Sequence, residues 1–240
     1  MNAGGALTDD DLEKRWLDYA REVVHDADHR AACAGLGGSP AADGFPEDVR
    51  WPGSLGRTYC EGGVLWVSNI HRNFDSAGVT VSAATDAADL VRRWRDGVIG
   101  DALFLEGIRG VYEHGLATWT VGTWPRKVLA ALGYSVSDVL YTNAARCQST
   151  GTGEALQRFC LVRFPLDRLV EEMRPGLVLI TSATALSITE TGSWACPVVA
   201  FSQRNGRLVL ASPWKPVGVD SGVSASEWIP ALAAELSGSG

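Results

Sequence analysis

The chain has 240 residues, of which 46% are hydrophobic and 20% charged, and its formal net charge at pH 7 is −7. This composition is typical of a folded globular protein and excludes a disordered chain, a collagen and a coiled coil. The acidity excludes nucleic-acid binding driven by overall charge, so any such function must come from a local site. We expect one domain over residues 1–240.

The N-terminal part combines a helix with a long Gly- and Pro-rich segment. Thr8 precedes three aspartates, and apolar residues then recur at helical spacing, which predicts a helix over about 9–34. Residues 35–63 have no apolar period and predict a long ordered loop. No apolar run reaches the roughly eighteen residues of a membrane span, and the N-terminus is acidic. We therefore expect a cytoplasmic protein without membrane contact.

The rest of the chain alternates strand and helix patterns. Short apolar runs that end in polar residues predict buried strands at residues 64–69, 139–143 and 177–181. Helical patterns lie at residues 85–95, 125–132 and 153–173, the last divided by Pro165. Asn205-Gly206 predicts a hairpin between 198–201 and 208–211, and a terminal helix begins near Ser224. This alternation predicts a three-layer α/β/α sandwich with a mostly parallel central sheet.

Ligands of such sheets bind beyond the carboxyl ends of the strands. Four segments follow those ends and form the candidate site, at residues 68–75, 143–147, 182–184 and 212–215.

Three segments together resemble the uracil-DNA glycosylase superfamily. They are Val-Ser-Asn-Ile-His-Arg-Asn-Phe-Asp-Ser-Ala-Gly at 67–78, Asp-Val-Leu-Tyr-Thr-Asn-Ala-Ala-Arg-Cys at 138–147, and Arg-Pro-Gly-Leu-Val-Leu-Ile-Thr-Ser-Ala-Thr-Ala at 174–185. The middle segment is similar to the family's Tyr-Thr-Asn strand, which Lys or Arg and then Cys follow. The resemblance implies a uracil-DNA-glycosylase-like fold and hydrolysis of the N-glycosidic bond of a base in a nucleic acid or nucleoside, as in DNA base-excision repair.

Two residues match the family's base-binding positions. Asn143 stands where the family holds the asparagine that binds a flipped pyrimidine, and an amide offers both a donor and an acceptor to a base edge. The alternative is an asparagine that caps a strand-to-loop turn. Phe74 is the candidate for stacking on the base, and the alternative for Phe74 is a place in the core.

The two catalytic loops depart from the family's pattern. Ser68-Asn69-Ile70-His71 replaces a loop that bears an acid or amide, and Ser212-Pro213-Trp214-Lys215 replaces a His-Pro-Ser loop. We expect Asn69 or His71 to handle water or charge. Ser212 or Lys215 would then assist the departing base. The departures also favour a second hypothesis, a catalytically inactive member of the fold that binds nucleic acid or a protein partner.

Arginines near these segments are candidates for phosphate contacts. Arg72, Arg126 and Arg146 would form the local positive rim that an acidic protein needs to hold a nucleic acid.

Four of the five cysteines are candidate metal ligands. Cys147 and Cys160 are spaced as in the iron–sulfur branch of the family, which implies a [4Fe-4S] cluster completed by Cys33 and Cys60. Separate buried thiols are an equally weighted alternative, and zinc is a weaker one because no Cys-x-x-Cys pair exists. Cys196 is expected to be an ordinary buried thiol.

Overall fold

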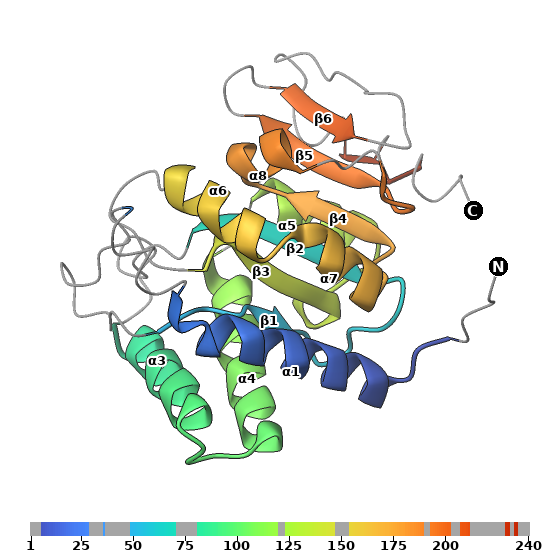
Figure 1. Ribbon diagram of the computed structural model, residues 1–240. Coiled ribbons are helices and arrows are strands. Elements are labelled where there is room, and N and C mark those ends of the chain that lie inside the picture. The colour runs from blue at the N-terminus through green and yellow to red at the C-terminus, as the bar shows by residue number, and fades with distance from the viewer. Residues whose placement is uncertain are drawn as a thin grey trace.

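The computed structural model describes residues 6–28, 36, 49–70, 81–119, 123–146, 154–189, 193–202, 207–211, 229–230 and 233–234. Within these residues the fold is α/β, with a mixed, mostly parallel sheet flanked by helices (Figure 1). The strands are β1 (Ser54–Leu55), β2 (Val64–Ile70), β3 (Val139–Ala145), β4 (Leu177–Ile180), β5 (Val198–Ser202) and β6 (Arg207–Ala211). Their order in the sheet is β1-β3-β2-β4-β5-β6, with β3, β2, β4 and β5 parallel and the two edge strands antiparallel.

The helices flank this sheet. Figure 1 shows α6 (Glu154–Arg163) and α7 (Leu166–Met173) in front of the sheet and α5 (Trp124–Ala131) behind it. The other helices are α1 (Asp9–His25), α3 (Val81–Arg95), α4 (Asp101–Trp119) and α8 (Ala183–Ile188), and a 3-10 turn covers Val136–Asp138. No helix of the described ranges is long and apolar enough to cross a membrane.

Most of the predicted elements are present. The three predicted strands correspond to β2, β3 and β4, the hairpin arms to β5 and β6, and Pro165 separates α6 from α7. The sequence patterns did not identify α4, α8 or β1. Most of the predicted terminal helix falls outside the described residues.

Helix α1 begins as predicted and ends earlier than predicted. The side chains of Thr8 and Asp11 form a reciprocal capping box, and the buried stripe includes Leu12, Trp16 and Tyr19. The helix ends at His25 instead of continuing to residue 34. The next residue, Asp26, is extended, because a carboxylate is unfavourable at a helix C-terminus and this one pairs with Arg163 at 2.6 Å.

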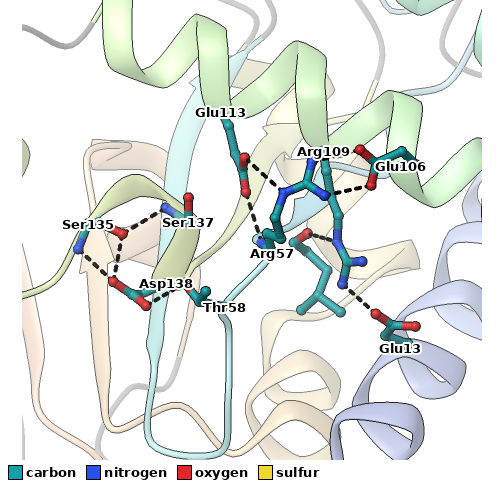
Figure 2. Close-up of polar contacts among 10 residues, drawn as sticks. Glu13, Arg57, Thr58, Glu106, Arg109, Glu113, Ser135, Ser137 and Asp138 are labelled. Carbon is teal, nitrogen blue, oxygen red and sulfur yellow. Dashed lines mark hydrogen bonds and ion pairs between the residues drawn. The ribbon is translucent and has the colours of Figure 1, made fainter.

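The Gly- and Pro-rich segment forms the edge of the sheet and is tied to two helices. Ser54 and Leu55 pair antiparallel with Tyr141 and Leu140 of β3. Figure 2 shows the contacts of this edge: Arg57 binds Glu106 of α4 at 2.7 Å, and Thr58 donates to Asp138 at 2.7 Å. Arg109 of α4 donates to the carbonyl of Leu55 at 3.0 Å and to Glu13 of α1 at 2.8 Å.

Candidate functional site

The carboxyl ends of β2 and β3 bring polar side chains together. Ser68 of β2 is the register partner of Asn143 of β3, and Tyr141 lies on the same face as Asn143 because side chains alternate along a strand. The Ser68 hydroxyl donates to Asn143 Oδ1 at 2.5 Å and lies 2.6 Å from the Tyr141 hydroxyl. Tyr141 also donates to Asn143 Oδ1 at 3.3 Å. Two hydroxyls therefore converge on one oxygen of the amide.

The other end of the Asn143 amide has no partner among the described residues. Asn143 is 1% exposed, and its Nδ2 is a buried atom without a hydrogen bond there. A buried donor left without an acceptor costs about 1–3 kcal/mol. The described bonds of the side chain go to other side chains and not to the backbone of a turn. Among the described residues, the amide nitrogen is therefore the end of the side chain that lacks a partner.

Two neutral phenols lie on this side of Asn143: Tyr141 contacts the amide, and Tyr112 packs against Tyr141. Burial raises the pKa of Tyr141 to about 12, and its bond with Ser68 opposes that rise. The ring of Tyr112, from α4, lies 5.4 Å from that of Tyr141, and burial raises the pKa of Tyr112 well above its usual value. Both hydroxyls are therefore protonated at neutral pH and bind as uncharged donors and acceptors.

Arg146 lies directly after β3 and is 0% exposed, so it is not part of a surface rim. Its Nη2 donates to the hydroxyl of Tyr19, and its guanidinium lies 5.7 Å from the Tyr19 ring. Its Nε and Nη1 atoms have no hydrogen-bond partner in the described part of the chain. The prediction of a rim residue was wrong because α1 covers the end of β3 with Tyr19.

The remaining sequence-predicted residues are not gathered around Asn143. Asn69 is exposed, and because it follows Ser68 along β2 its side chain faces the opposite side of the sheet. Arg126 is half-buried in the first turn of α5. Several predicted residues lie outside the described residues, namely His71, Arg72, Phe74, Ser212 and Lys215.

The structure separates two of the four predicted cluster ligands. Cys60 is exposed in the segment before β2, and Cys160 of α6 accepts from the Arg146 backbone N–H at the opposite end of β3. Seven residues of parallel strand span roughly 20 Å, far more than one iron–sulfur core can bridge. A cluster held by all four cysteines does not fit this arrangement, nor does one zinc ion held by both Cys60 and Cys160. Cys33 and Cys147 lie outside the described residues, and those described contain no metal-binding group of three His, Cys, Asp or Glu side chains.

A cavity lies at the end of the sheet opposite to Asn143. It has a volume of about 600 Å³ and is bordered by α7 and by the segments that precede β4 and β5. Cys196 lies in its wall, and burial raises the pKa of that thiol, so it is a poor nucleophile at neutral pH. None of the predicted site residues lines this cavity.

Sequence reasoning missed the groups that orient Asn143. Tyr141 and Ser68 stood in the predicted strands, and period-two alternation places Tyr141 on the face of Asn143. The pairing of Ser68 with Asn143 depends on the register of β2 against β3. Tyr112 belongs to α4, for which no prediction was made.

No protein-family model matches the sequence, and a search of curated proteins found no significant relative.

Proposed function

We propose that this protein recognises a nucleobase through Asn143 and hydrolyses the N-glycosidic bond that joins this base to its sugar. The reaction is the one implied by the resemblance of residues 67–78, 138–147 and 174–185 to the uracil-DNA glycosylase superfamily. The three-layer α/β/α sandwich of that family is part of the same proposal.

The buried amide of Asn143 is the observation that supports this proposal. Its oxygen is occupied by Ser68 and Tyr141, and its Nδ2 has no acceptor among the described residues. A base that presents a carbonyl oxygen, such as uracil, hypoxanthine or xanthine, would accept from this amide. A base with an amino group at that position would leave two donors facing each other, which a buried site rejects strongly.

The position of Asn69 favours a second candidate function, base binding without hydrolysis. Asn69 faces the other side of the sheet from Ser68 and Asn143, so it does not aim at a base held by Asn143. Hydrolysis then depends on residues beyond the described ranges, whereas the Asn143 amide proposed to recognise the base is described.

Base release tests the proposal directly. We expect the purified protein to release bases from a panel of oligonucleotides and nucleosides that carry uracil, hypoxanthine or xanthine. Asn143→Asp keeps the size of the side chain but removes the N–H donor, and it should lower kcat/KM by about 100-fold or more. Chromatography of the released base over time measures base release and kcat/KM for the unmodified protein and for Asn143→Asp.

Thr142→Val provides the matched control. Thr142 is 0% exposed, is adjacent to Asn143 and has a hydroxyl without a partner among the described residues, but it faces the other side of the sheet. This variant should release the base as the unmodified protein does. If the unmodified protein binds the base without releasing it, and Asn143→Asp loses this binding, the result supports base binding without hydrolysis. If the folded protein neither releases nor binds any of these bases, base recognition is refuted.

A further inference from the structure

The described surface of this acidic protein carries cations that are mostly neutralised by carboxylates. Arg57, Arg163 and Arg174 each lie within 3.1 Å of a carboxylate oxygen. Ion pairs of this kind leave little positive charge for a polyanionic strand, and the net charge of −7 repels one.

Three arginines are buried among the described residues, namely Arg50, Arg109 and Arg146, and Arg146 is the least exposed of them. Arg109 shows the usual condition of a buried arginine. Arg109 is 9% exposed, and its Nη2 and Nε reach Glu13 and the Leu55 carbonyl. Arg146 is 0% exposed, and its described side-chain hydrogen bond is the one to the uncharged Tyr19 hydroxyl. Its Nε and Nη1 lack acceptors among the described residues, and no described carboxylate pairs with it. A buried charge in this condition is costly unless an anion completes it.

A guanidinium selects the type of anion. It has five N–H donors in a plane and no acceptor, so it suits the oxygens of a phosphate or carboxylate. Arg146 directly follows the last residue of β3, three residues after Asn143, so both lie at the carboxyl end of this strand.

We propose that Arg146 binds the phosphate group of a mononucleotide whose base is bound by Asn143. This inference rests on the proposed function and narrows its substrate class to free nucleoside monophosphates. The net charge of −7 disfavours a polyanionic strand, and a fully buried guanidinium is easier to reach for the terminal phosphate of a small molecule than for the backbone of a nucleic acid. Water would form the new bond to the sugar C1′ as the C1′–N bond breaks. The products are the protonated free base and a sugar phosphate.

Inorganic phosphate is the probe for the anion site. At constant ionic strength, phosphate should raise the Tm of the unmodified protein in a concentration-dependent manner, because it binds only the folded state. Arg146→Met should abolish this shift and leave the Tm without phosphate unchanged or higher, because it removes an incompletely paired buried charge. Arg146→Lys keeps the charge but loses the planar fork, and it should keep a weaker response.

Arg109→Met is the matched control, because it removes a buried arginine that already binds a carboxylate and a backbone carbonyl. It should lower the Tm without phosphate and retain the phosphate-induced shift. If Arg146→Met instead lowers the Tm as Arg109→Met does and phosphate leaves the unmodified protein unchanged, Arg146 is structural and the inference is wrong. An equal phosphate shift in all variants would also overturn it.

Nucleotide binding separates this inference from the proposed function. A 5′-monophosphate should bind at least about 10-fold more tightly than its nucleoside, and Arg146→Met should remove that difference. Asn143→Asp should weaken both ligands. Equal affinity of nucleoside and monophosphate, both weakened by Asn143→Asp, would overturn the phosphate site and leave base recognition intact. A monophosphate preference that depends on Arg146, with no effect of Asn143→Asp, would support the phosphate site and refute base recognition.

Discussion

At the residue scale, two hydroxyls fix the orientation of the Asn143 amide. An amide placed alone at a strand end presents a donor and an acceptor with equal ease. Ser68 and Tyr141 occupy the oxygen, and the nitrogen has no partner among the described residues, so it is the group that we propose binds a base. Because Ser68 and Tyr141 are uncharged, they orient the amide without placing a second charge in a buried site.

Tyr141 also makes the stability of the protein sensitive to alkali. Burial raises the pKa of Tyr141 from 10.0 to about 12. The unfolded chain ionises this phenol first, so its contribution to stability is complete below about pH 10 and is lost as the pH rises towards 12. Between about pH 10 and 12, the free energy of unfolding should fall by about 2–3 kcal/mol less in Tyr141→Phe than in the unmodified protein. Urea titrations at several alkaline pH values measure the fall, and identical pH dependence in both proteins would contradict this reasoning.

At the element scale, the two-residue strand β1 holds the edge of β3, and Gly53 allows that contact. Its φ is +94°, and a Cβ there would lie 2.1 Å from the Tyr141 carbonyl oxygen. Only glycine tolerates both conditions without strain. The edge of the strand that carries Tyr141 and Asn143 therefore depends on a residue without a side chain.

Gly53→Ala should lower the free energy of unfolding by about 2–4 kcal/mol, because the backbone must move away from β3. Gly97→Ala is its control, since Gly97 also has a positive φ, of +71°, but open space around the added Cβ. That change should cost only about 1 kcal/mol. Urea denaturation measures both, and equal losses would show that the contact with β3 contributes nothing.

An element could be predicted from the sequence where neighbouring residues alone determine it. Strands β2, β3 and β4 were predictable because burial on both faces of a parallel sheet requires continuous apolar runs. Strand β1 was not, because Ser54 and Leu55 become a strand only through their pairing with β3. The end of α1 at His25 depends on Asp26, whose partner Arg163 lies on a helix far along the chain.

At the scale of the whole molecule, the negative net charge and the ion-paired surface disfavour long polyanions. We expect the affinity for a single-stranded oligonucleotide to be weak. A plot of the logarithm of the binding constant against the logarithm of the salt concentration should have a slope of magnitude below about 2. Proteins that make many phosphate contacts give steeper slopes. Fluorescence anisotropy at several salt concentrations measures this slope. Tight binding with a steep slope would favour the nucleic-acid-binding alternative.

The sequence by itself determined the α/β alternation and the place of Asn143 after an apolar strand, because both depend on patterns within a few neighbouring residues. Only the tertiary structure decided which end of the Asn143 amide is bonded within the described residues, since Ser68 reaches its oxygen from another strand. It also decided that Arg146 is buried and that Cys60 and Cys160 lie at opposite ends of the sheet. These properties depend on how segments distant in the chain pack together, and local periodicity carries no information about that packing.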